Sequence, residues 1–503
     1  MKNTLQVLIF LISIFLLLFF TKSLWEGWLL GVLSILTTLS VIFISFVIFL
    51  ENRRPTQTLT WLVVLGSFPL LGFFFYLLFG RNYRKKKLFR QKALFDEEAY
   101  LRVEGNIDQL EDKIEHMEEN KLLFRLAHKL AKSPITFSTD TRVLTNGEET
   151  FNEIFAQLEK ASHHIHLEYY IVRDDEVGQK LKNILIDRAK KGVQVRFLYD
   201  AVGSWKLSKK YISDLKEAGV EIVAFSPVKL PFLNNKINFR NHRKIIVIDG
   251  TIGFVGGLNI GDEYLGRDKY FGFWRDTHLV VKGEAVRSLQ LIFLQDWHYM
   301  TGKAYLSQDY LSPQLLEGDQ FGGGVQMIAG GPDSEWEIIK NLFFAMIISA
   351  KRSIWISSPY FIPDDDILSA LKIAALSGID VRILVPQRPD KKIVFYASRS
   401  YFPILLEAGA KIYEYKDGFM HNKIIIVDGQ LASIGTANMD MRSFHLNFEI
   451  NAFLYKTSST TKLVSDFLED FDRSSLIILE EFNKRSLKQR IIESTSRLLS
   501  PLL

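Results

Sequence analysis

Cysteine is absent from the 503-residue chain, so no disulfide bond forms; this agrees with a reducing compartment without establishing one. The sequence also lacks the P-loop, HExxH and GxSxG patterns, which leaves a kinase, a zinc protease or a serine hydrolase without support. A net charge of +5 is too small to indicate nucleic-acid binding unless the basic residues are concentrated in one patch.

Charge is missing from three apolar runs near the amino terminus, Leu5–Phe20, Leu29–Leu50 and Thr60–Phe79. A helix that spans a bilayer needs about 20 predominantly apolar residues. The second run meets this length, the first is shorter, and Pro69 interrupts the third. The pattern predicts a membrane anchor over residues 1–92 with two or three transmembrane helices.

A basic cluster follows these runs, with Arg81, Arg84–Lys87, Arg90 and Lys92 and no acid among them. By the positive-inside rule this end faces the cytoplasm. The cluster is also able to attract anionic lipid headgroups, or it serves only to stop transfer across the membrane. The sequence therefore predicts a multi-pass protein of the cell membrane, with the remaining chain on the cytoplasmic side.

The chain after the cluster is organised as a repeat. Residues 93–134 have helical spacing and predict a connector, and short β-rich runs alternate with helices after Pro134, which predicts α/β folding around a largely parallel sheet. The same order of strand, capped helix and glycine recurs, with Gly192 in one copy and Gly378 in the other. We assign the first repeat to 135–310, the second to 320–480, and a helical tail to 481–503.

Each repeat places one His, one Lys and one Asp at identical intervals, with an Asn at an equivalent position downstream. The first set is His242, Lys244, Asp249 and Asn259, and the second is His421, Lys423, Asp428 and Asn438. A single His-x-Lys-x4-Asp match arises by chance at roughly the few-per-cent level. Two matches at equivalent places in a repeat are not accidental, so these eight residues are the candidate catalytic and phosphate-binding groups.

The spacing suits phosphate chemistry because residues two apart on an extended segment project to the same face. One neutral imidazole is then able to attack phosphorus while the other, protonated, donates to the leaving oxygen. Lys244, Lys423, Asn259 and Asn438 are placed to hold the non-bridging oxygens. Asp249 and Asp428, five residues after their lysines, are expected on the opposite strand face, in a supporting role.

These motifs resemble those of the phospholipase D superfamily, over roughly residues 135–480. The resemblance implies one active site at the interface of the two repeats, a phosphohistidine intermediate, and no metal or other cofactor. It also implies that the amino-terminal copy supplies the nucleophile, so that His242 attacks and His421 acts as acid and then base. Asp276 and Glu449 are candidates for orienting the histidines, and their pairing with the two imidazoles stays open.

The flanking sequences are similar to those of bacterial cardiolipin synthases: Glu51–Pro55, His166–Tyr170, Phe239–His242, and Asn438–Phe444 continuing to Glu449. That resemblance implies transfer of a phosphatidyl group from one phosphatidylglycerol to another, giving cardiolipin and glycerol at the bacterial membrane without nucleic acid. It leaves the oligomeric state open. The three apolar runs depart from the family, which typically has two.

Alternative functions remain for the same motifs. A hydrolytic phospholipase D or a phosphatidylserine synthase would use the same residues, and so would a nuclease of the superfamily. The apolar amino terminus and the lack of a basic groove interleaved with aromatic residues argue against the nuclease. Two complete motifs argue against a non-catalytic membrane scaffold.

Three other polar segments are set aside. His163, His164 and His166 resemble metal ligands, but no further ligand set accompanies them. The acids of 174–176 and 364–366 stand where helix caps are expected. Residues 226–241 form a loop that either dips into the bilayer edge or lies on the protein surface.

Overall fold

The computed structural model describes residues 28–50, 55–67, 72, 76, 82–103, 119–227, 238–312, 323–334 and 336–500. The chain divides into two compact units, Met1–Lys85 and Lys86–Leu503. The apolar run at residues 5–20 and residues 228–237 of the expected loop lie outside the described residues.

The amino-terminal unit contains helices α2 (Trp28–Leu50) and α3 (Pro55–Ser67). Buried Ile48, Leu65 and Tyr76 form its small core, where the rings of Trp61 and Tyr76 meet edge to face. The described start of the third apolar run, residues 60–67, belongs to α3, which has 13 residues and is about 20 Å long at 1.5 Å per residue.

The predicted transmembrane helices are not confirmed. In the described part of the chain, no helix is long and apolar enough to cross a membrane. The expectation of two or three spans, and of a multi-pass protein, is therefore wrong for these residues. One physical reason is visible in α3, which ends at Ser67, two residues before Pro69. A proline ring disfavours helical geometry in the residue before it, so helices end there or earlier.

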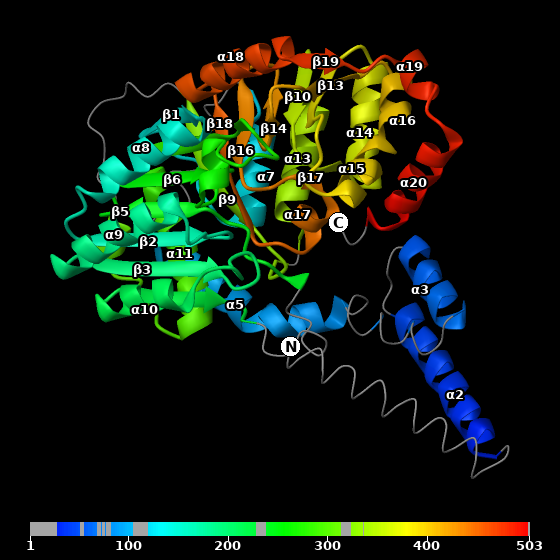
Figure 1. The fold of residues 1–503 in the computed structure, drawn as a ribbon, viewed down its shortest axis with the longest axis horizontal. Helices are drawn as coiled ribbons and strands as arrows, with labels where there is room; N and C mark the ends of the chain where they lie inside the picture. Colours follow the sequence, from blue (N-terminus) through cyan, green and yellow to red (C-terminus); the bar gives the residue numbers. More distant parts are fainter. Residues whose placement is uncertain are drawn as a thin grey trace. The chain divides into compact units, whose positions relative to one another are not determined.

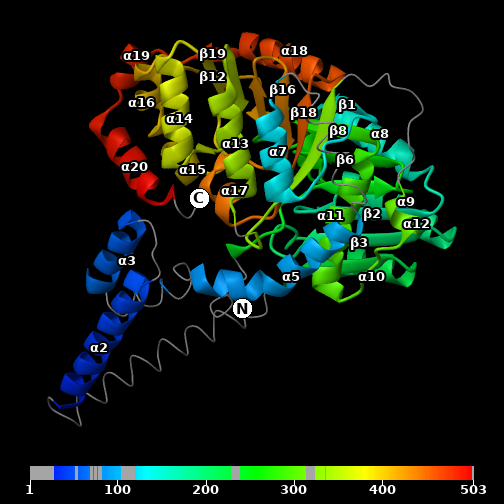
Figure 2. The ribbon, with the colours of Figure 1, turned by 180° about the vertical axis from the view of Figure 1, so that it is seen from behind.

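The larger unit is built from two sheets with the same strand order, seen left and right of centre in Figure 1 and from behind in Figure 2. The first sheet has the order β1 (Thr139–Thr145), β8 (Thr277–Gly283), β6 (Ile252–Gly256), β5 (Ile245–Ile248), β2 (His164–Tyr169), β3 (Gln194–Asp200), β4 (Glu221–Phe225). The second has β9 (Gly324–Gly330), β18 (Glu449–Tyr455), β16 (Leu431–Gly435), β15 (Ile424–Val427), β10 (Ser353–Ser357), β12 (Asp380–Pro386), β13 (Lys411–Tyr415) and an added edge strand, β19 (Ser474–Leu476). The two sheets make the repeat predicted from the sequence visible as structure.

The sheets are mixed, so the prediction of a largely parallel sheet is wrong. In the first, only β2, β3 and β4 pair in parallel, while β5, β6, β8 and β1 pair antiparallel. The reason is a hairpin after each His/Lys motif. Asp249 and Gly250 have φ of 53° and 66°, and Asp428 and Gly429 have 54° and 69°. Such left-handed pairs make the tight turns that return a strand antiparallel to itself.

The helices of the first repeat are α8 (Asn146–Leu158), α9 (Glu176–Lys190), α10 (Lys209–Glu217), α11 (Ala285–Thr301) and α12 (Gln308–Leu311). Those of the second are α13 (Ile338–Ser349), α14 (Asp365–Leu376), α15 (Lys392–Arg399), α16 (Phe402–Glu407), α17 (Met441–His445), α18 (Ser458–Asp472), α19 (Leu479–Asn483) and α20 (Leu487–Leu498). α5 (Asn82–Val103) and α7 (Lys121–Ala131) precede the first sheet in the chain. As expected, Asp175 and Asp364 cap α9 and α14.

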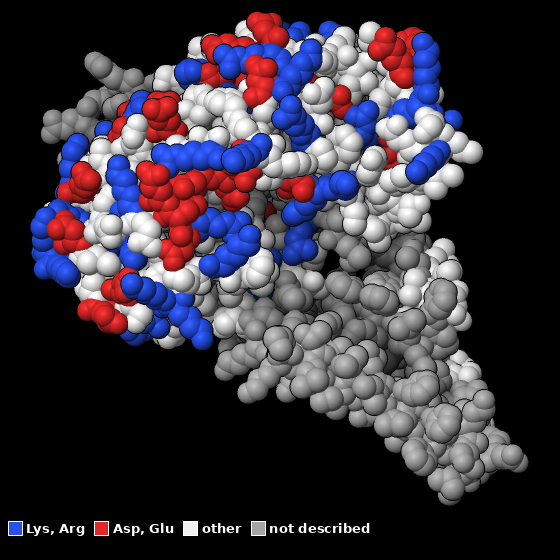
Figure 3. All heavy atoms as spheres, viewed as in Figure 1, with Lys and Arg blue, Asp and Glu red and all other residues white. Residues whose placement is uncertain are grey.

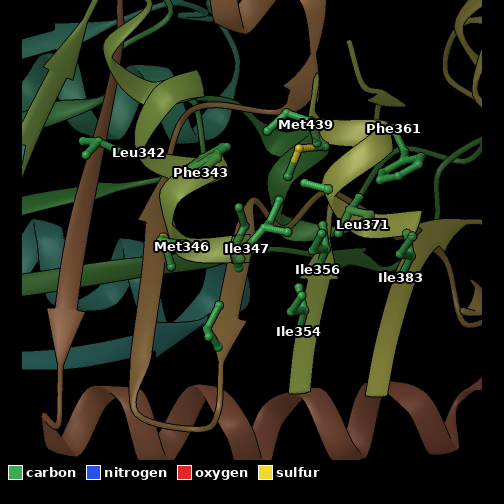
Figure 4. Packing of buried hydrophobic residues seen from close by; sticks show 14 of the residues in the cluster. Leu342, Phe343, Met346, Ile347, Ile354, Ile356, Phe361, Leu371, Ile383 and Met439 are labelled. Atoms are coloured by element: carbon green, nitrogen blue, oxygen red, sulfur yellow. The ribbon is translucent and has the colours of Figure 1, made fainter. Parts of the chain in front are cut away.

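Among the apolar cores of the larger unit, three join the sheets to their helices or to each other. One joins the first sheet to α8, α9 and α10, and a second joins the other sheet to α13, α14 and α16. Figure 4 shows this second core, where Phe343 and Met346 of α13 lie near Ile354 and Ile356 of β10. A third core contains residues of both sheets together with α11 and α18. The two repeats therefore fold against each other into one body.

The hairpin aspartates close each sheet at the end away from the motif histidines. Asp249 accepts hydrogen bonds from the backbone N–H groups of Ser162, His163 and His164, at 2.8 to 2.9 Å. Burial opposes ionisation of Asp249, but these donors outweigh it and lower the pKa of the carboxyl. Asp428 does the same for residues 351–353, at 2.7 to 2.9 Å. Both carboxylates tie the hairpin to the start of the neighbouring strand.

We predict that Asp249→Ala lowers the free energy of unfolding by about 2–3 kcal/mol, because it leaves a turn of backbone donors without their charged acceptor. Urea unfolding followed by circular dichroism measures the change. Asp140→Ala, which alters an exposed aspartate of β1, is the control and should leave the midpoint in place. Equal midpoints for the two variants would contradict the clamping role.

Candidate active site

The two motifs lie at the interface of the repeats, where the backbone of each repeat contacts the backbone of the other. The backbone N–H of His242 donates to the carbonyl of Phe448 at 2.9 Å, and that of His421 donates to the carbonyl of Arg275 at 2.7 Å. Short parallel pairings flank both contacts, Asn241 with Phe448 and β14 (Phe419–Met420) with β7 (Trp274–Arg275). Each histidine is thus carried by one repeat and held by the backbone of the other.

The side chains are exchanged in the same way. Nδ1 of His242 lies 2.9 Å from Oε2 of Glu449, and Nδ1 of His421 lies 2.7 Å from Oδ2 of Asp276. The sequence left this pairing open, and the structure pairs each imidazole with the acid of the opposite repeat. Neither motif histidine therefore finds its carboxylate partner within its own repeat.

This pairing determines which ring nitrogen is free to react. A carboxylate accepts hydrogen bonds, so each Nδ1 carries the proton and each Nε2 has its lone pair available. The acids are oriented in turn by a donor two residues earlier. Trp274 Nε1 donates to Asp276 at 3.3 Å, and Asn447 Nδ2 donates to Glu449 at 3.1 Å. Sequence reasoning missed these donors, although each stands two residues before its acid in the chain.

Burial favours the neutral form of both imidazoles. The pKa of His242 falls to about 4, chiefly because burial disfavours the cation, against the raising effect of Glu449. The pKa of His421 also falls to about 4, through burial and the nearby charge of Lys423. Burial raises the pKa of Asp276 and Glu449, but the imidazoles and lysines beside them outweigh it, so both acids stay ionised. Near neutral pH each Nε2 is therefore a competent nucleophile.

The motif lysines are buried, and among the described residues no carboxylate pairs with either of them. Lys244 Nζ donates to the carbonyl of His242, and Lys423 Nζ to that of His421, each at 2.6 Å. Burial lowers the pKa of Lys244 to about 7 and that of Lys423 to about 8, while Glu449 and Asp276 oppose the shift. Two cations held by neutral acceptors are well placed to receive an anionic phosphate.

The two motif asparagines are not equivalent. Asn259 is occupied by the fold, because its Oδ1 accepts from the N–H of Ile171 at 3.1 Å and its Nδ2 donates to Tyr264 Oη at 3.2 Å. Within the described residues, Oδ1 of buried Asn438 has no hydrogen-bond partner. Of the two, Asn438 retains the polar atom that a ligand would satisfy.

The structure also places the motif aspartates and the histidines near the start of β2 outside the histidine–acid pairs. Asp249 and Asp428 do not join the histidines, since their carboxylates bind the starts of β2 and β10. The imidazoles of His164 and His166 contact the side chain of Gln290, and Arg196 also contacts His166. The candidate catalytic centre consists of the crossed histidine–acid pairs and the two lysines.

Comparison with known sequences agrees with this geometry. Residues 154–297 and 343–474 match the family described as Cardiolipin synthase, PLD-like domain, and residues 28–81 match Phospholipase D-nuclease N-terminal. A cardiolipin synthase of Geobacillus sp. (strain WCH70) is 70% identical over the whole of both chains. The chain belongs to the bacterial cardiolipin synthases of the phospholipase D superfamily. This confirms the resemblance drawn from the motifs.

Other relatives support the same family. A cardiolipin synthase of Halalkalibacterium halodurans is 67% identical over the whole of both chains. Cardiolipin synthase 2 of Bacillus anthracis is 65% identical, covering 93% of this chain and 90% of its own. Family membership makes the protein a membrane-associated phosphatidyltransferase that acts on phospholipids.

A solved structure shares the fold. The crystal structure of a phosphatidylserine synthase from Haemophilus influenzae superposes with a TM-score of 0.56 at 15% identity, covering 76% of this chain and 100% of that chain. At that identity the likeness is evidence for the arrangement of the two repeats alone.

The lysines should set the alkaline limit of activity. Each is charged below its lowered pKa and neutral above it, so KM for the phospholipid should rise as pH increases through about 7 to 8. Lys244 loses its charge first, and Lys244→Arg keeps a charge there, so this variant should move the limit up toward the pKa of Lys423, about 8. Initial rates between pH 5 and 10 test this. A limit that stays near 7 in Lys244→Arg would assign it to another group.

Proposed function

We propose that the protein transfers a phosphatidyl group from one phosphatidylglycerol to another, forming cardiolipin and releasing glycerol through a phosphohistidine intermediate. The observation that carries the proposal is the exchange of carboxylates between repeats, which leaves two Nε2 atoms, one from each motif, to act on one phosphodiester. Two displacements at phosphorus, with one imidazole attacking and the other moving the proton, fit this arrangement.

In the first displacement, Nε2 of His242 attacks phosphorus and the bond to the headgroup glycerol oxygen breaks. His421, protonated in the complex with the anionic lipid, gives its Nε2 proton to that oxygen, and glycerol leaves. Lys244, Lys423 and Asn438 are proposed to hold the non-bridging oxygens, where negative charge builds.

In the second displacement, the glycerol hydroxyl of another phosphatidylglycerol enters. His421 takes its proton, the hydroxyl oxygen attacks phosphorus, and the bond between phosphorus and His242 breaks. The products are cardiolipin and the starting enzyme, with no water consumed.

The protein is proposed to act at the cytoplasmic surface of the bacterial membrane. The basic residues Arg81 and Arg84–Lys87 support this, since the cytoplasmic leaflet is anionic and each basic residue near it contributes about 1 kcal/mol of attraction. On the face drawn in Figure 3, basic and acidic side chains are intermingled rather than gathered in one basic track. This favours a lipid substrate over the nuclease alternative.

Phosphatidylglycerol alone should be a sufficient substrate. Purified full-length protein in mixed micelles should form cardiolipin and glycerol in equal amounts, without a nucleotide-activated lipid and with a chelator present. Lipid extraction followed by mass spectrometry measures both products. Accumulation of phosphatidic acid would identify a hydrolase, and a requirement for a cytidine-nucleotide lipid would refute the proposed reaction.

The assignment of the two histidines can be tested by trapping. With phosphorus-labelled phosphatidylglycerol and a rapid quench, His421→Ala should retain acid-labile label, because His242 is still able to attack. His242→Ala should show no label, and both variants should lack turnover. The reverse pattern would exchange the two roles, and no label in wild type would refute a covalent intermediate.

A further inference from the structure

A lysine from the basic cluster lies deep inside the catalytic body. Lys92 is on α5 and only 2% exposed. Its Nζ lies 2.5 Å from Asp96, 2.9 Å from Asp333 and 3.0 Å from Asp296. This side chain is therefore not available to lipid headgroups and holds three carboxylates together instead.

Asp296 of α11 connects Lys92 to the first motif. Its other oxygen accepts from Arg243, which stands between the motif residues His242 and Lys244. Nε of Arg243 donates at 3.1 Å to the carbonyl of Glu449, the acid paired with His242. One chain of contacts thus runs from α5 through two buried side chains to both members of the His242–Glu449 pair.

A second branch reaches the residue before His242. The amide of Asn241 donates to Glu168, whose carboxyl interacts with Asp296. Burial, followed by the charge of Asp296, raises the pKa of Glu168. Burial likewise raises the pKa of Asp96 to about 6. Asp296 is shared between Lys92 and Arg243, and Lys92 also contacts Asp96 and Asp333, so removing Lys92 takes a shared cation away from three carboxyl groups.

An apolar contact reinforces the link. Phe89, one helical turn before Lys92, meets the rings of Phe239 and Phe448 edge to face, with centroids 5.3 Å apart in both cases. Phe239 leads into the motif, and the carbonyl of Phe448 accepts from the N–H of His242. In both views of the ribbon, α5 lies along this side of the body (Figures 1 and 2).

The second motif is supported differently. Asn422 takes the place of Arg243, and it contacts Thr277 and Asp470 from within the two repeats. Asp470 is paired with Arg275 at 2.8 Å. The contacts of Lys92 and Phe89 therefore reach the surroundings of His242, and the His421 motif has a separate set of contacts.

We propose that Lys92 is a positioning residue for His242, acting through Asp296 and Arg243, so that docking of α5 sets the geometry of the attacking imidazole. This inference rests on the proposed role of His242. α5 is the first helix of the catalytic body after the amino-terminal unit. The proposal means that this helix helps to position an active-site residue.

The test compares Lys92→Met with a matched control, Lys340→Met, in the full chain. Lys340 is 4% exposed and pairs with Asp364 at 2.7 Å and Asp366 at 2.5 Å, between α13 and α14. Both variants should lower the midpoint of urea unfolding. Only Lys92→Met should reduce kcat and the rate of phosphohistidine labelling, by at least about tenfold with KM little changed, because misplacing the nucleophile slows attack without weakening lipid binding.

The double variant Lys92→Met/Asp333→Asn separates positioning from charge balance. It removes one cation and one anion, so the unfolding midpoint should recover while kcat stays low. Wild-type kcat in folded Lys92→Met, an equal loss of kcat in Lys340→Met, or recovery of kcat in the double variant would each overturn the proposal. Failure of the proposed function would appear separately, as wild-type protein that makes no cardiolipin from phosphatidylglycerol.

Discussion

The exchange of histidine–carboxylate partners between the two repeats is the constraint on which the site depends. Each imidazole needs its acid to fix the tautomer, and that acid is supplied by the other repeat, Glu449 at the start of β18 and Asp276 directly before β8. The exchange works only if the sheets meet in one register, which the shared core of both sheets and helices α11 and α18 maintains. Packing and catalysis are therefore linked through the same interface.

The charges around the two motifs favour the binding of an anion. With both imidazoles neutral, Lys244 and Lys423 are balanced by Asp276 and Glu449. A phosphodiester adds one negative charge in a dry environment, and this favours a proton on one imidazole. The two motifs have the same spacing, so they do not by themselves decide which imidazole is protonated. Binding of the substrate helps to establish that difference between the acid and the nucleophile.

Much of this site could be predicted because the His/Lys/Asp motif occurs at equivalent positions in both repeats. The paired motifs identified His242, Lys244, His421 and Lys423, and the structure brings them together. The antiparallel strands were missed, although Asp249-Gly250 between two apolar runs is a hairpin signal. The acid partners could not be assigned, because partner exchange depends on how the sheets dock. The burial of Lys92 could not be predicted, because Lys92 follows a run of basic residues and was therefore assigned to the same basic cluster.

The exchanged partners also determine when the enzyme becomes competent during its own synthesis. A ribosome releases His242 long before Glu449, and the chain elongates at about 5–20 residues per second while the first domain folds. During that interval the first repeat has a nucleophile without its acid, and its strands lack the second sheet. Under the proposed mechanism the growing chain therefore does not attack phosphodiesters, and reactivity begins only when the second repeat has folded.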